Sequence, residues 1–269
     1  MKVESRFTQH KGLRDGEGVP NSLEALLANY RGSLEADAVL LSDGTIAIVH
    51  GRDIGRQLPE LEKMNIDQLE EVDIGTAVRN GSGKTNIPLL REFVGLATDA
   101  GTAVSLELKA SSIEKSVQLA ESVARELLAM KQEDGMRGNE RFLEKGMVFE
   151  SFSTTALHAL KAMGDAEHMS FNTTLYWPSN RNAARTQALF DSDVLDDTDV
   201  ELKSMTWEFV GVEVAFANGF DAVEYQPDKI TQGLVEYAHT VGIEVNCGLV
   251  TDEKEQNRLF GMGVDHILI

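Results

Sequence analysis

The stretch Ser33-Leu34-Glu35-Ala36-Asp37-Ala38-Val39-Leu40-Leu41 decides the fold, because it has the composition of a buried β-strand and yet carries two carboxylates. Residues i and i+2 of a strand point to the same side, so Glu35 and Asp37 share one face of it. Two like charges in an apolar setting are destabilising unless a cation or a shared proton relieves them. The sequence therefore predicts a strand whose polar face needs positive charge.

A second extended segment follows at once. The strand pattern stops at Ser42-Asp43-Gly44, which is a turn sequence, and resumes in the apolar run 46–49. His50 stands at the end of that run. A carboxylate pair and a histidine on neighbouring extended segments predict a metal site with an acid or base beside it.

Short apolar runs alternate with amphipathic segments over the rest of the chain. We expect strands at 7–9, 33–41, 46–49, 104–109, 147–149, 168–171, 221–225, 243–247 and 266–269. Helical patterns separate most of them; for example, Ser111 and Glu114 form a capping box. This alternation predicts an α/β fold, a TIM (β/α)8 barrel with a small insertion after the second strand segment. We expect a single barrel domain over 1–269, with the insertion at approximately 52–87.

Size and charge narrow the class of protein. The 269 residues, 42% of them hydrophobic, suit one large core. The net charge of −19 repels nucleic acid and anionic membranes, so we expect neither as a partner. The single cysteine, Cys247, excludes an internal disulfide, and no apolar run is long enough for stable membrane insertion. Because the N-terminus has no apolar signal region, we expect a cytoplasmic protein; a secreted form whose signal has been removed is the alternative.

Carboxylates gather at the carboxyl ends of the predicted strands. Glu35 and Asp37 lie in one strand, and Glu107 and Lys109 end another. Barrel active sites are built at that end of the strands. Three carboxylates make a hard oxygen site that suits one divalent cation, Mg²⁺ or Ca²⁺. Zinc is disfavoured because no Cys/His ligand spacing is present.

Two histidines end neighbouring strands. His10 follows the first strand, and His50 follows the run 46–49. Imidazoles titrate near neutral pH, so the two could act as an acid/base pair. A lone histidine at a strand end is more often a structural hydrogen-bonding residue. The combination with the carboxylates is what indicates catalysis.

Several short motifs occur in an order and spacing that are specific when taken together. They are His10-Lys11-Gly12, Asn21-Ser22-Leu23, Glu35-Ala36-Asp37, Ser42-Asp43-Gly44, His50, Glu107-Leu108-Lys109, Glu150-Ser151-Phe152 and Gly263-Val264-Asp265. In this order they resemble the glycerophosphodiester phosphodiesterase family over essentially the whole chain. The resemblance implies a barrel hydrolase of lipid and glycerol metabolism. Such an enzyme would cleave a small-molecule glycerophosphodiester to glycerol 3-phosphate and an alcohol with one divalent metal ion.

The resemblance also implies a role for each site residue. Those roles are metal binding by Glu35, Asp37 and Glu107, acid/base catalysis by His10 and His50, and phosphate binding by Lys11 and Lys109. It does not distinguish the acid from the base.

Four positions depart from the family pattern. Lys11 replaces an arginine, Pro20 a glutamate, Gly51 an aspartate and Gly248 a tryptophan. The metal and histidine set is intact, whereas the residues around the substrate differ, so the resemblance implies the phosphodiester chemistry more directly than the identity of the alcohol. Two alternatives therefore stay open: lysophospholipase D-like hydrolysis of lysophospholipids, and a weakly catalytic barrel that binds a phosphate ligand.

Overall fold

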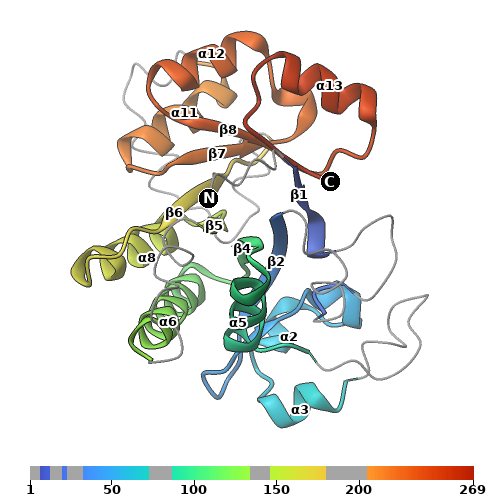
Figure 1. The fold of residues 1–269 in the computed structure, drawn as a ribbon, viewed down its shortest axis with the longest axis vertical. Helices are drawn as coiled ribbons and strands as arrows, with labels where there is room; N and C mark the ends of the chain where they lie inside the picture. The colour runs from blue at the N-terminus through green and yellow to red at the C-terminus, as the bar shows by residue number, and fades with distance from the viewer. Residues whose placement is uncertain (1–6, 13–19, 23–32, 73–86, 134–145, 180–204) are drawn as a thin grey trace.

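In a computed structural model, the chain forms a closed barrel of eight parallel strands with helices around it (Figure 1). The structure describes residues 7–12, 20–22, 33–72, 87–133, 146–179 and 205–269. The strands are β1 (Phe7–Gln9), β2 (Ser33–Leu40), β3 (Ile46–Ile48), β4 (Ala103–Leu108), β5 (Met147–Ser151), β6 (Asn172–Tyr176), β7 (Ala222–Tyr225), β8 (Glu244–Cys247) and β9 (His266–Leu268). Parallel pairing of β1 with both β2 and β9 closes the ring, and β3 pairs antiparallel with β2 outside it. The predicted TIM (β/α)8 barrel is confirmed.

Helices follow most of the barrel strands. The α-helices are α2 (Leu58–Leu61), α3 (Ile66–Glu70), α5 (Leu90–Ala100), α6 (Ile113–Gln132), α8 (Thr154–Ala166), α11 (Trp207–Ala217), α12 (Gln232–Thr240) and α13 (Glu253–Gly261). The 3-10 helices are η1 (His10–Gly12), η2 (Gly51–Ile54) and η5 (Pro227–Lys229). Side-chain oxygens cap several N-termini; the Asp252 carboxylate, for example, accepts a hydrogen bond from the backbone N–H of Glu255 at the start of α13.

Strand alternation separates the core from the barrel interior. On β2, the apolar residues Leu34, Ala36 and Ala38 are fully buried in the core shared with α5 and α6. The residues between them, including Glu35 and Asp37, face inward. The two-residue period of β2 thus places the carboxylates inside the ring.

Two local predictions differ from the structure. We expected a strand at 168–171, but β6 begins at Asn172, and His168 has a φ of 56° in the turn after α8. The apolar side chains Met169 and Phe171 are buried in the core, so their alternation does not mark a strand. The N-cap of α6 is Ser112 rather than Ser111, whose backbone N–H and hydroxyl donate to the Glu62 carboxylate instead.

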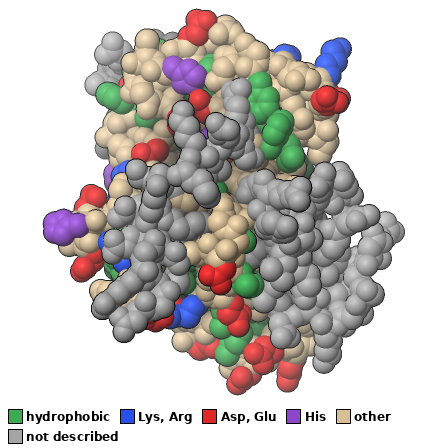
Figure 2. Space-filling model, in the orientation of Figure 1, with side chains coloured by type: hydrophobic (Ala, Val, Ile, Leu, Met, Phe, Trp, Pro, Cys, Tyr) green, Lys and Arg blue, Asp and Glu red, His purple; other side chains and the backbone are tan. Residues whose placement is uncertain are grey.

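The region expected as an insertion follows β3. Its described part, up to residue 72, contains η2, α2 and α3, and residues 73–86 lie outside the described residues. Acidic side chains gather at the lower end of the face in Figure 2, around α3, where Asp67, Glu70 and Glu71 are exposed. Among the described helices, none combines the length and apolar composition needed to cross a bilayer. That 52–87 is an insertion in a single domain stays our proposal.

Candidate active site

Parallel pairing of β2 with β4 assembles the carboxylates. Asp37 stands directly opposite Glu107 in the register of the two strands, and Glu35 lies two residues before Asp37 on the same face. One carboxylate oxygen from each of the three residues lies within 4.8 Å of the other two. The three residues are at most 7% exposed. The predicted metal ligands therefore do come together in the folded chain.

Burial and repulsion between neighbouring carboxylates raise the pKa of Glu35 and of Glu107. Burial, with repulsion from Asp37 and Glu107, raises the pKa of Glu35 well above its ordinary value. Burial also raises the pKa of Glu107 to about 7, although the Lys109 ammonium opposes that change. Negative charge in this cluster is thus only partly balanced by the protein.

The donor set fits a hard divalent cation. Lys109 Nζ lies 2.5 Å from Glu107 Oε1 and 3.3 Å from Asp37 Oδ1, so it neutralises one side of the cluster. Glu35 Oε1 is buried and has no hydrogen-bond partner among the described residues. An orphaned carboxylate oxygen among oxygen donors is what a site for Mg²⁺ or Ca²⁺ requires.

The turn after β1 brings His10 and Lys11 to the cluster. Lys11 has a φ of 54°, in the left-handed region, which is unusual for a residue with a side chain. Its backbone N–H donates to Glu35 Oε2 at 2.9 Å, while its ammonium donates to Asp53 Oδ2 at 2.8 Å. His10 Nε2 lies 3.8 Å from the same Glu35 oxygen. Burial and the Lys11 charge lower the pKa of His10, which keeps its ring neutral near pH 7.

His50 reaches the site from β3. The backbone N–H of Val49 donates to the Asp37 carbonyl at 2.8 Å, which holds the end of β3 beside β2. His50 Nδ1 lies 3.7 Å from Asp53 Oδ1, and Asp53 also accepts the Lys11 ammonium. Burial opposes ionisation of Asp53, but the contacts from His50 and Lys11 outweigh it and lower its pKa.

Sequence reasoning missed two residues of this site. Asn21 Nδ2 donates to Asp37 Oδ2 at 3.0 Å, and Asn21 Oδ1 accepts the backbone N–H of Asp37 at 3.1 Å. Its place in the motif after Pro20 was the available signal. Asp53, which joins His50 to Lys11, had no signal because it lies two residues beyond the position where the family has its aspartate. Both residues fix the orientation of groups that the sequence did identify.

Local packing accounts for two of the departures. A Cβ atom on Gly51 would lie 2.7 Å from the Arg56 carbonyl oxygen, so the backbone of η2 leaves no room for a side chain there. A Cβ atom on Gly248 would lie 3.3 Å from Glu224 Oε1 and 3.4 Å from Gln226 Nε2. Part of the space that a tryptophan would fill is therefore occupied by these two polar side chains.

We expect Gly51→Asp to destabilise the protein by about 1–3 kcal/mol, because the backbone of η2 must shift to admit the side chain. Thermal unfolding monitored by circular dichroism measures the effect. Gly95→Ala in α5 is the matched control: a Cβ there meets nothing within 4 Å, and alanine favours a helix over glycine. A midpoint for Gly51→Asp equal to that of the parent would show that the loop has room.

The fold and the site define a class of protein: an α/β barrel that carries buried carboxylates and two histidines at the carboxyl ends of its strands, where barrel enzymes have their active sites. A model of the Glycerophosphoryl diester phosphodiesterase family matches residues 16–269. The chain belongs to this family and is therefore a phosphoric diester hydrolase. The His10-Lys11-Gly12 motif precedes the matched range.

Solved structures share the fold at low sequence identity. A Silicibacter pomeroyi protein, provisionally named a glycerophosphoryl diester phosphodiesterase, is 18% identical with a TM-score of 0.72, covering 100% of this chain and 90% of its own. An Oleispira antarctica phosphodiesterase in complex with the product sn-glycerol-3-phosphate is 18% identical with a TM-score of 0.69, covering 97% and 91%. A Parabacteroides distasonis glycerophosphodiester phosphodiesterase is 17% identical with a TM-score of 0.68, covering 100% and 93%. No curated protein sequence matches the chain.

Proposed function

We propose that this protein hydrolyses glycerophosphodiesters to glycerol 3-phosphate and an alcohol with the help of one divalent cation, Mg²⁺ or Ca²⁺. The observation that carries the proposal is the buried cluster of Glu35, Asp37 and Glu107, with an orphaned oxygen on Glu35 and a histidine beside it. Membership of the family supports the reaction class. The product in the Oleispira antarctica structure supports glycerol 3-phosphate as the common half of the substrates.

Three residues would hold the cation, namely Glu35, Asp37 and Glu107. When bound, it would polarise a phosphoryl oxygen and offset the negative charge that develops on the phosphate. Asn21 keeps the Asp37 carboxylate oriented, and the Lys11 backbone N–H does the same for Glu35.

The histidines would move the protons. His10 is neutral near pH 7 because its pKa is lowered, and a neutral imidazole can accept the proton of the attacking oxygen. We therefore assign His10 as the general base. His50 has Nδ1 turned toward Asp53, which leaves Nε2 to donate a proton to the departing alkoxide. The bond between phosphorus and the alcohol oxygen breaks as the new bond to the attacking oxygen forms.

The two lysines would bind the phosphate. The Lys109 ammonium contacts Asp37 and Glu107 of the cluster, and the Lys11 ammonium is held by Asp53 beside His50. With a cation held by the carboxylates of the cluster, Lys109 would be free to contact a phosphate oxygen. A lysine presents a point charge rather than the two-pronged contact of an arginine, so Lys11 binds the phosphate less directionally than the family's arginine would.

A substrate panel with and without EDTA tests this function. We expect turnover of glycerophosphodiesters and of a generic aryl phosphodiester, and loss of at least about 100-fold of the rate when EDTA removes the cation. Re-addition of Mg²⁺ or Ca²⁺ should restore it. Turnover of lysophospholipids in place of glycerophosphodiesters would favour the lysophospholipase D-like alternative. Phosphate binding without any turnover would favour the binding protein.

A further inference from the structure

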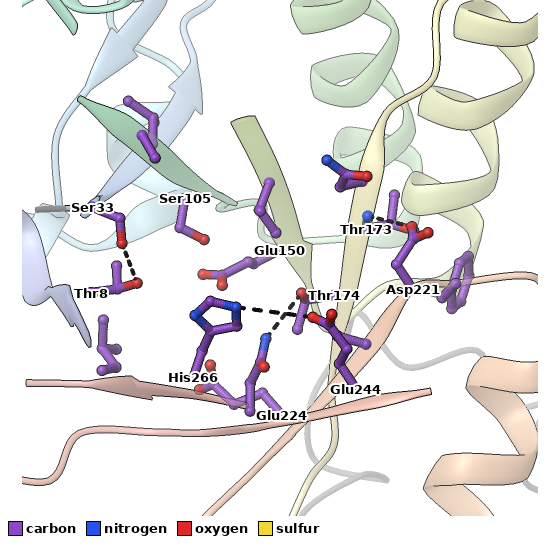
Figure 3. Close-up of a pocket in the computed structure, with 18 of the residues that line it drawn as sticks. Thr8, Ser33, Ser105, Glu150, Thr173, Thr174, Asp221, Glu224, Glu244 and His266 are labelled. Carbon is purple, nitrogen blue, oxygen red and sulfur yellow. Dashed lines mark hydrogen bonds and ion pairs between the residues drawn. The ribbon is translucent and has the colours of Figure 1, made fainter. Parts of the chain in front are cut away.

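A polar cavity lies in the barrel interior and opens at the end where the strands begin; Figure 3 shows side chains that line it. Its volume is about 520 Å³. Its mouth is formed by the first residues of successive strands, namely Ser33, Ala103, Asn172, Ala222, Glu244 and His266. Barrel interiors are ordinarily packed with valine, isoleucine and leucine. Here hydroxyl, amide and carboxylate groups line a hollow interior, which is the composition of a binding site.

Two carboxylates lie deep in this cavity. Glu150 is 6% exposed and accepts a hydrogen bond from the Tyr176 hydroxyl at 2.6 Å. Glu224 lies nearby, and no described residue donates a hydrogen bond to its carboxylate. Burial and repulsion from Glu150 raise the pKa of Glu224 well above its ordinary value. No lysine or arginine among the described residues forms an ion pair with either carboxylate, so a cationic ligand is the partner that would favour their charged form.

An orphaned amide oxygen lies on the same wall. Asn246 follows Glu244 on β8 by two residues, lines the cavity and is only 7% exposed. Its Nδ2 donates to Thr174 Oγ1 at 3.4 Å, whereas its Oδ1 has no partner among the described residues. A buried carbonyl oxygen without a donor is uncommon in proteins and marks a place where a ligand supplies one.

The side chains that line the cavity favour a cationic ligand that carries N–H groups. No lysine or arginine occurs among the described residues that line the cavity, and Lys109 is already engaged by Asp37 and Glu107. The deep groups, two carboxylates and an amide oxygen, all accept hydrogen bonds. The cavity volume is in the range of small-molecule pockets and far exceeds the space of one inorganic ion. Thr8 and Ser33, whose hydroxyls are 2.6 Å apart, line the wall nearer the mouth.

We propose that this cavity binds a small primary ammonium compound, such as a diamine or an amino alcohol. The ammonium group lies among Glu150, Glu224 and Asn246 Oδ1, and the polar remainder of the ligand extends along the hydroxyl-lined wall to the mouth. On the rim, His266 Nε2 and Glu244 Oε2 are 4.0 Å apart. The ammonium position borders the carboxylate cluster, because Glu150 stands opposite Glu107 in the strand register, whereas the mouth lies where the strands begin. Binding of the ammonium compound does not depend on the proposed phosphodiester hydrolysis.

Calorimetric titration of the full EDTA-treated chain with 1,4-diaminobutane tests the proposal. We expect saturable binding with one site and a Kd below about 1 mM. Tetramethylammonium, which has the charge but no N–H group, should bind at least about tenfold more weakly. The Glu35→Gln variant, which loses one carboxylate of the neighbouring cluster, should retain saturable binding of 1,4-diaminobutane.

Two variants address the cavity directly. Glu224→Gln removes one of the two carboxylates, and Ala222→Leu fills the mouth; each should weaken binding at least about tenfold. Ala217→Leu, on the exposed side of α11, is the matched control and should leave binding unchanged. Circular dichroism checks the fold, and if one cavity variant does not fold, the other decides. Any of three results would overturn the proposal. They are no saturable binding by the parent, undiminished binding by a folded cavity variant, and loss of binding in folded Glu35→Gln.

Discussion

Replacing His10 by alanine is expected to lower kcat for phosphodiester hydrolysis by about 10²–10⁴-fold, which is the usual contribution of a positioned general base. The reason is that His10 is the neutral imidazole beside Glu35, and no other described histidine lies within ion-pair distance of that carboxylate. The measurement is kcat at saturating divalent cation. His158→Ala in α8 is the control: its ring contacts Asn218, so its loss should change kcat less than twofold.

The choice of leaving group separates the two histidines. An aryl alcohol with a low pKa departs without a proton, so His50→Ala should lose much less activity on such an ester than on an alkyl glycerophosphodiester. A missing base slows both reactions, so His10→Ala should be impaired about equally on the two substrates. Full activity in His10→Ala would remove this residue from the mechanism. The opposite pattern of the two variants would exchange the roles.

Replacing Glu35 by glutamine is expected to abolish measurable cation binding and activity while making the cation-free protein more stable. Glutamine removes one of the three proposed carboxylate ligands and nearly preserves the shape of the side chain. Its amide oxygen can still accept the Lys11 backbone N–H. Calorimetric titration with Mg²⁺ and Ca²⁺ measures binding, and thermal unfolding in EDTA measures stability.

The expected gain in stability follows from the direction of the pKa change. An acid whose pKa is raised in the folded state destabilises that state at any pH above the unfolded pKa, because the folded chain resists the ionisation that the unfolded chain undergoes. Glutamine does not ionise, so it removes this destabilising contribution to the free energy of unfolding. The unfolding midpoint in EDTA should therefore rise by a few degrees, about 2–4 °C per kcal/mol. Glu236→Gln, on the exposed face of α12, should change neither quantity. Undiminished cation affinity in Glu35→Gln would exclude Glu35 as a ligand.

Much of the fold follows from local pattern. The strand at Ser33–Leu40 and the segment that brings His50 to its end were predictable because their apolar residues have a two-residue period and a turn sequence lies between them. The two-residue period predicted a strand wrongly just before β6, where the alternating apolar residues Met169 and Phe171 pack in the core after a helix end. Alternation reports which side chains are buried, and a turn can bury them as well as a strand.

The sequence by itself determined the barrel class, because strand periodicity and motif order are local properties of the chain. For the same reason it identified the main groups of the candidate site, which are Glu35, Asp37, Glu107, His10 and His50. Only the tertiary structure decided how those groups are held: Asn21 meets Asp37, and Asp53 joins Lys11 to His50, through contacts between segments far apart along the chain. The cavity, too, was decided only by the tertiary structure, because its walls come from strands paired around the ring. No local sequence pattern predicts which side chains face one another across a closed barrel.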